Sequence, residues 1–199
     1  MVDNFDIITR FVQNIYENDN NIYFHLQILQ RKKDGNDIGC NSRLIKTYQI
    51  DKEHPLPKYK DRIIGYCKEF NARAYINLSP KSKESTAVQM LHSLADCFRQ
   101  RNFHYLDKLW NSAAGKVGGV KNYWIIDCDY SEDLNDRTIN DMINFIDRNC
   151  KPDGIKFVTC IPTKNGKHII TTPFDVRAFK EAYHNIDIHK NNPTILFIN

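Results

Sequence analysis

Hydrophobic and polar residues along the first part of the chain predict helices and paired strands. Residues 3–17 repeat apolar side chains at helical spacing, which indicates an amphipathic helix that packs as core. Residues 21–30 and 43–50 are rich in Ile, Tyr and Leu and flank a stretch of Asp, Gly and Asn, so we expect a long β-hairpin. Residues 63–70 return to helical spacing.

A strand and a long helix follow. Residues 72–78 alternate, with small or apolar side chains on one face and Arg73, Tyr75 and Asn77 on the other. Residues 84–101 carry an apolar stripe at helical spacing, and we expect this stripe to be core. Its members are Val88, Leu91, Leu94, Ala95 and Phe98.

The small, glycine-rich stretch after this helix is the best internal boundary. Residues 111–119 contain three glycines among small side chains, which indicates a flexible connection. We therefore expect an N-terminal α/β lobe over residues 1–110, a connection over residues 111–122, and a second lobe over residues 123–199.

The residue pattern of the second lobe predicts the element order βαββαβ. Asn165-Gly166 is a strong hairpin signal between two strands, and Asp175 is a good N-cap. Residues 193–198 give the last strand. This order is that of a ferredoxin-like or RNA-recognition-motif-like unit, so the expected fold class is α+β.

Composition predicts a folded protein that is neither secreted nor embedded in a membrane. The chain has 199 residues, of which 41% are hydrophobic and 26% charged, which is sufficient for a core. No apolar run approaches the roughly 18 residues of a membrane span, and the start does not resemble a signal peptide. The six cysteines include no CxxC pair. We expect reduced thiols and a cytoplasmic protein.

Charge is unevenly distributed along the chain. The net charge of +4 comprises −3 for residues 1–20, +8 for residues 21–120 and −1 for residues 121–199. A basic middle section is a modest indication of a polyanionic partner, because Lys and Arg release counterions from phosphates. Ordinary solvated surfaces are charged too, so this alone decides nothing.

Two acids at the end of a strand give the sharpest chemical signal. In the stretch Trp124–Asp129, Asp127 and Asp129 lie two positions apart and therefore project from the same face. Paired carboxylates suit Mg²⁺ or Mn²⁺. The alternative is a pair of acids that merely leads into a solvated loop. Cys128, between them, would face the opposite side, so we do not expect it to be a nucleophile.

A second signal surrounds the predicted hairpin turn. Lys164 and Lys167 flank the turn and His168 follows on the strand, so cations and an imidazole could hold a phosphate there. The alternative is a hairpin with solvated lysines.

A third signal is the polar face of residues 72–78. Arg73 beside Tyr75 could bind a phosphate and stack a base, with Asn77 and Lys116 nearby. An interface between the lobes is an equally good interpretation. The chain contains no Walker A motif, GxSxG or HExxH.

These signals together resemble the archaeo-eukaryotic primase superfamily, the catalytic core of primases and primase-polymerases. In that family an hhDhD strand supplies metal-binding acids, and a small-x-His motif supplies a histidine that contacts nucleotide phosphates. Ile125–Asp129 matches the first motif, and Gly166-Lys167-His168 matches the second. The resemblance implies an N-terminal α/β lobe packed on an RNA-recognition-motif-like lobe, with the active site between them.

The resemblance also implies an activity, a cofactor and partners. The activity is metal-dependent nucleotidyl transfer that makes or extends a primer. Asp127 and Asp129 would hold Mg²⁺ or Mn²⁺, while His168, Lys164 and Lys167 would hold the triphosphate. The partners are a nucleoside triphosphate, a single-stranded DNA or RNA template and a helicase or other replication proteins, as in a phage or mobile element.

The last predicted strand departs from the family pattern. The family has a third acid in a later strand, whereas residues 194–199 contain no carboxylate. Either the third ligand is absent, or Asp187, the nearest acid, or Asn199 replaces it as a metal ligand, or the usual strand lies in a part not present. Two other functions are therefore kept as alternatives: a non-catalytic module that binds single-stranded nucleic acid, and a metal-dependent nuclease.

Overall fold

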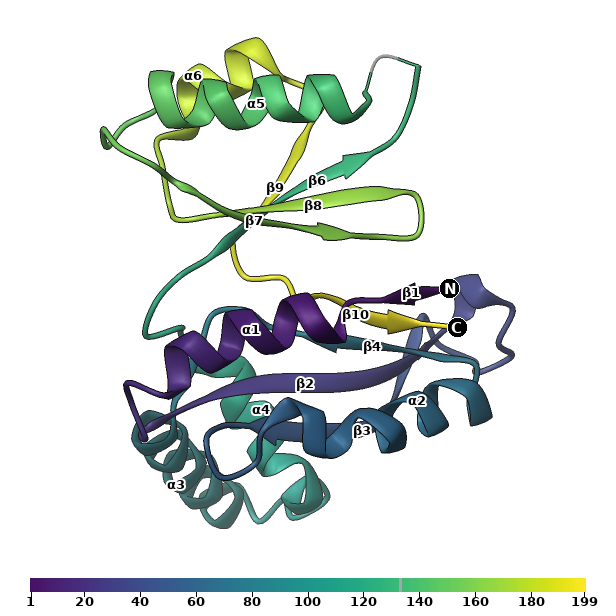
Figure 1. Ribbon diagram of the computed structural model, residues 1–199. Coiled ribbons are helices and arrows are strands. Elements are labelled where there is room, and N and C mark those ends of the chain that lie inside the picture. The colour runs from purple at the N-terminus through teal and green to yellow at the C-terminus, as the bar shows by residue number, and fades with distance from the viewer. Residues whose placement is uncertain (133) are drawn as a thin grey trace.

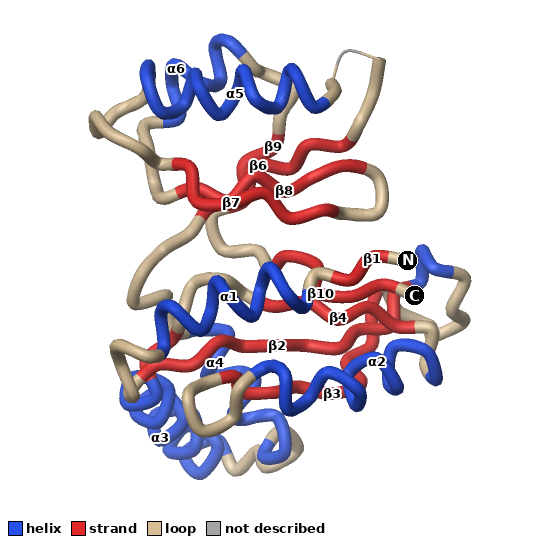
Figure 2. Tube along the Cα trace, in the orientation of Figure 1, coloured by secondary structure: helices blue, strands red, loops and turns tan. Residues whose placement is uncertain are grey.

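The computed structural model describes residues 1–132 and 134–199. Over these residues the chain forms two antiparallel β-sheets and six α-helices, so the mixed α+β class predicted from the sequence is confirmed (Figures 1 and 2).

The first sheet joins the two ends of the chain. In chain order its strands are β1 (Val2–Asp3), β2 (Ile22–Arg31), β3 (Ser42–Ile50), β4 (Ala72–Ile76), β5 (Lys81–Ser82) and β10 (Thr194–Ile198). The spatial order is β1-β10-β4-β2-β3, with β5 paired to the start of β2. β2 and β3 form the predicted hairpin, in which Phe24 faces Ile50 and Arg31 faces Ser42.

Four helices accompany the first sheet. They are α1 (Phe5–Tyr16), α2 (Lys60–Glu69), α3 (Lys83–Gln100) and α4 (Leu109–Lys116). α1 buries Phe5, Ile8 and Val12, as its helical spacing predicts. α3 and α4 pack against each other and lie on the side of the first sheet that is remote from the second sheet (Figure 1).

The second sheet has the spatial order β7-β8-β6-β9, and all its neighbouring strands are antiparallel. Its strands are β6 (Trp124–Asp129), β7 (Phe157–Pro162), β8 (Gly166–Thr171) and β9 (Asp187–His189). α5 (Asp136–Asn149) and α6 (Val176–Ala182) lie on the face turned away from the first sheet (Figure 1). The Asn135 and Asp175 side chains cap these helices by accepting backbone N–H bonds.

The last strand of the chain is a correction to the sequence prediction. Residues 193–198 were expected to complete the βαββαβ unit, but β10 pairs with β1 and β4 in the first sheet, and β9 takes the fourth position of the second sheet. Periodicity identifies a strand but not its partners. The short β9 gave no periodic signal, so the wrong segment was assigned to the last place.

The region from residue 84 to residue 119 differs from expectation in two ways. Four members of the apolar stripe of α3 are exposed and Leu94 is half-buried, whereas the fully buried side chains of the helix are the small polar Thr86 and Ser93. The predicted flexible connection begins as a helix, because α4 runs to Lys116 and buries Ala113 and Ala114. Small residues here permit close helix packing rather than flexibility.

One hydrophobic core joins the two sheets. Tyr123, Ile125, Ile161 and Ile170 come from the second sheet and its approach, and they belong to the same buried cluster as α1 and the first sheet. The face of the second sheet that α5 and α6 leave free is therefore turned toward the first sheet. No helix in the described part of the chain is long and apolar enough to cross a membrane.

Buried His25 on β2 makes folding sensitive to pH. Its ring is 8% exposed and packs edge-on against Trp110. Burial lowers the pKa of His25 to about 4. Between about pH 6.5 and 4 the unfolded chain therefore binds a proton that the folded chain does not. The free energy of unfolding decreases as the pH is lowered across this window. The full loss is about 3 kcal/mol at pH 4.

We expect His25→Gln to flatten this pH dependence in urea unfolding curves recorded between about pH 4.5 and 7. His104→Gln is the matched control, because His104 is exposed and should leave the dependence unchanged. Equal slopes in His25→Gln and the wild type would contradict the assignment.

Candidate functional site

Strand β6 divides its side chains between two faces. Ile126 and Cys128 pack into the cluster under α5 and α6, whereas Asp127 and Asp129 lie on the face toward the first sheet. The two acids thus share a face, as the spacing predicts. Burial raises the pKa of the Cys128 thiol to about 12, so this thiol stays protonated at neutral pH and is not an activated nucleophile.

The hairpin of β7 and β8 brings His168 to Asp127. The two residues are cross-strand partners, and His168 Nε2 lies 3.4 Å from Asp127 Oδ1. Gly166 pairs with Asp129, and a Cβ at position 166 would lie 1.9 Å from the carbonyl oxygen of Cys128. Glycine therefore lets β8 approach β6, which explains the small residue two positions before the histidine.

Asp127 lies between two histidines. His189 on β9 places its Nε2 3.8 Å from Asp127 Oδ2, so each carboxylate oxygen faces an imidazole. The interaction with His168 holds the pKa of Asp127 below its usual value, although partial burial opposes this shift. Sequence reasoning missed His189, because a three-residue strand carries no readable period.

A small cavity of about 190 Å³ collects residues from three of the predicted signals. Both β6 acids line it together with His168, Lys164 and the polar face of β4. The full lining is Lys33, Arg73, Tyr75, Asp127, Asp129, Thr163, Lys164, Asn165, His168, Ile195 and Ile198. The structure thus brings together predicted residues that are far apart in the sequence, such as Arg73 and His168, which are 95 positions apart.

Arg73 is already paired inside this region. Its guanidinium donates two hydrogen bonds to the Asp34 carboxylate, one of them from Nε to Oδ2 at 2.7 Å. This guanidinium holds the pKa of Asp34 below its usual value. Lys33 and Lys164 also line the cavity, and neither has an ion-pair partner within the described residues. Sequence reasoning missed Lys33, because its turn is far from the other motifs.

Lys167 does not line the small cavity together with His168, contrary to expectation. Neighbouring residues of a strand point to opposite faces, so Lys167 lies on the helix side of β8. Its Nζ is 2.8 Å from Asp136 Oδ1, and Tyr130 donates its hydroxyl proton to the same oxygen at 2.6 Å. Lys167 therefore stabilises the start of α5.

Asn77 and Lys116 also lie outside the small cavity. Asn77 follows β4 and accepts a hydrogen bond from the Ser79 backbone at 2.9 Å, while its amide lies 3.3 Å from the Asn191 side chain. Lys116 ends α4, which packs on α3. Of the predicted polar face, Arg73 and Tyr75 line the cavity.

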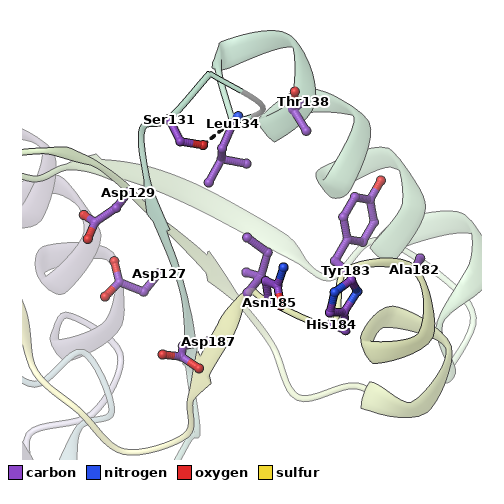
Figure 3. Close-up of a pocket in the computed structure, with 11 residues that line it drawn as sticks. Asp127, Asp129, Ser131, Leu134, Thr138, Ala182, Tyr183, His184, Asn185 and Asp187 are labelled. Atoms are coloured by element: carbon purple, nitrogen blue, oxygen red, sulfur yellow. Dashed lines mark hydrogen bonds between the residues drawn. The ribbon is translucent and has the colours of Figure 1, made fainter.

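A larger cavity of about 460 Å³ lies on the other side of the two acids (Figure 3). Asp127 and Asp129 line both cavities. The larger one is bounded by the start of α5 and by the segment from α6 to β9, and no Lys or Arg is among the described residues that line it. Its other lining residues are Ser131, Leu134, Thr138, Ala182, Tyr183, His184, Asn185, Ile186 and Asp187.

Asp187, the candidate third ligand, is the cross-strand partner of Asp127 on β9. It therefore shares the face of the two β6 acids and lines the larger cavity with them (Figure 3). Among the described residues, no group of three or more His, Cys, Asp or Glu side chains is arranged to hold a metal ion. Asp127 and Asp129 still fit a Mg²⁺ ion shared with a ligand, since Mg²⁺ often takes one or two carboxylates plus substrate phosphates.

Comparison of the chain with known protein families, with curated proteins and with solved structures gave no significant match. The geometry of the two cavities is therefore the basis for the proposed function.

His168 is oriented from both sides of its ring. Its Nδ1 lies 2.8 Å from Thr194 Oγ1, and its Nε2 faces Asp127. An ionised carboxylate can only accept, so Nε2 must carry the proton, and Nδ1 of the neutral ring accepts from the Thr194 hydroxyl. β10 thus fixes the imidazole on the opposite sheet.

We expect the neutral ring of His168 to be the Nε2–H tautomer, which long-range ¹⁵N NMR of the imidazole can establish. Thr194→Val should increase the Nδ1–H fraction, because it removes the hydroxyl donor. Thr172→Val, outside this contact, should leave the tautomer unchanged. A dominant Nδ1–H form in the wild type would contradict the geometry.

Proposed function

We propose that the chain is a metal-dependent nucleotidyltransferase that resembles a primase or primase-polymerase core. In this proposal, an N-terminal α/β lobe and an RNA-recognition-motif-like lobe enclose the active site between them. The observation that carries the proposal is the small cavity, in which Asp127 and Asp129 lie beside His168 and the cations Lys33 and Lys164. Acids for a metal ion and cations for phosphates are the two requirements of nucleotidyl transfer.

Asp127 and Asp129 would hold Mg²⁺ or Mn²⁺ together with the phosphates of a nucleoside triphosphate. When bound, such an ion neutralises phosphate charge and makes a hydroxyl a better nucleophile. Lys33 and Lys164 would bind phosphate oxygens, because among the described residues neither ammonium group forms a direct ion pair with a carboxylate. His168, held by Thr194, presents an N–H beside Asp127, where it can donate to a phosphate oxygen.

The lining residues of the two cavities differ, and this difference suggests how a nucleotide would be oriented. The cations line the small cavity, whereas the larger cavity offers the apolar Leu134 and Ile186 and the amide of Asn185. An anionic triphosphate suits the first and a neutral nucleoside suits the second, with the two acids at the boundary. Arg73 and Tyr75, on β4 across the small cavity, would contact a single-stranded template.

We expect Asp127→Asn and Asp129→Asn each to weaken metal-dependent nucleotide binding at least tenfold, a loss of about 1.4 kcal/mol. The measurement is a calorimetric titration in which a nucleoside triphosphate and Mn²⁺ are added to each protein variant. Primer synthesis and extension assays follow. Both substitutions keep the side-chain shape. Asp61→Asn, at an exposed position of α2, is the control that should bind as the wild type does.

The same titrations separate the proposal from its alternatives. Metal-independent binding of single-stranded nucleic acid without nucleotide binding would replace the enzyme with a non-catalytic module. Release of nucleotides from DNA or RNA with Mg²⁺ alone would indicate a nuclease. Either result would overturn the proposed function.

The β7–β8 hairpin provides a matched pair of lysine variants. Lys164→Ala removes a cation from the small cavity and should weaken nucleotide binding roughly tenfold at low salt. Lys167→Ala should leave binding unchanged, because Lys167 faces α5 and pairs with Asp136. The calorimetric Kd of the two variants is the measurement, and equal losses would contradict the assignment of the phosphates to the small cavity.

A further inference from the structure

The outward face of α3 is apolar and largely exposed to solvent. Val88, Leu91 and Phe98 are 47%, 67% and 64% exposed. The opposite face of the helix holds Thr86 and Ser93, which are buried toward the rest of the protein. α3 is thus already held by one face while a second, apolar face lies in solvent, which is typical of a surface that another protein covers.

The exposed residues have the spacing of a helix–helix contact. Val88, Leu91, Ala95 and Phe98 are separated by three, four and three positions, which is the alternation of a and d positions in a coiled coil. We call these four residues the α3 seam. Ser93 falls opposite the seam, in agreement with its burial. A seam of this spacing is built to receive a second helix.

The patch extends beyond the end of the helix. The ring of Phe103 meets that of Phe98 edge-on, with centroids 5.3 Å apart, and Phe103 is itself 45% exposed. Tyr105 and Leu106, just after it, are also exposed. The apolar surface therefore continues at the C-terminal end of α3.

Charges at the two ends of α3 complement each other in the antiparallel direction. Glu84 lies in the first turn, and Arg101 follows the last turn. Neither has an ion-pair partner in the described chain, whereas the nearby Arg99 is held by Asp96 at 2.8 Å. A parallel copy of α3 would place like charges together. An antiparallel copy would place each Glu84 beside an Arg101.

We propose that the α3 seam is the interface of a symmetric dimer, in which α3 packs antiparallel on α3 of a second copy of this chain. The two-fold axis passes between Leu91 and Ala95, so Leu91 faces the small Ala95 of the other copy and Val88 faces Phe98. The same register places Glu84 near Arg101. Such an isologous contact is closed and uses the same surface on both copies.

This dimer leaves the candidate site open. α3 lies on the side of the first sheet that is remote from the second sheet (Figure 1), whereas the acids lie between the two sheets. The interface is thus independent of the proposed function and can be tested without any nucleotide.

Light scattering after size-exclusion chromatography, over about 1 to 100 µM protein, tests the proposal. The wild type should reach twice the chain mass of 23.4 kDa. Leu91→Asp should remain a monomer with an unchanged circular dichroism spectrum, because the side chain is already exposed. Ile155→Asp is the control, since Ile155 is 83% exposed elsewhere and should not affect dimerisation.

Charge reversal tests the antiparallel register. Glu84→Arg and Arg101→Glu should each weaken the dimer about fivefold, and the double variant should regain most of the loss. Failure of the double variant to recover would overturn the register. A wild type that is monomeric at all concentrations, or a Leu91→Asp variant that still dimerises, would overturn the proposal and leave the seam to a helix of another protein.

Discussion

The packing of the free face of the second sheet against the first sheet is the contact on which the candidate site depends. Tyr123, Ile125, Ile161 and Ile170 lie in one core with the first sheet and α1, so the two sheets share buried apolar surface. The Asn4 side chain adds hydrogen bonds to the carbonyls of Pro162 and Ile195, which lie in different sheets. Beyond this core the facing surfaces become polar, and that is where the acids and cations meet.

The charges in this polar region then determine which ligands it can bind. Asp127 is ionised, faces imidazoles on two neighbouring strands and borders both cavities. Asp34 neutralises Arg73, so the cationic character of the small cavity comes from Lys33 and Lys164. The region holds two carboxylates and two lysine ammonium groups around one cavity. Under the proposed function, these groups would bind a ligand that carries phosphates together with its own cation.

The apolar stripe of α3 shows that a helical pattern of hydrophobic residues need not be buried in the core of its own chain. Its apolar stripe has core-like spacing, which led to the prediction of burial, but the helix turns small polar residues inward. Amphipathic spacing indicates that one face of a helix is suited to contact another surface. It does not indicate which surface that is. In the proposed dimer the stripe is buried after all, by a second copy.

The sequence by itself determined the local elements and the local chemistry. The spacing of apolar residues located most helices and strands, and the two-residue period placed Asp127 and Asp129 on one face with Cys128 on the other. Which elements are neighbours, in contrast, is a property of the tertiary structure. Strand pairing placed β10 in the first sheet and β9 beside β6, which brought Thr194 and His189 to the site. The physical reason is that periodicity depends on residues close in sequence, whereas pairing and cavities depend on contacts between distant segments.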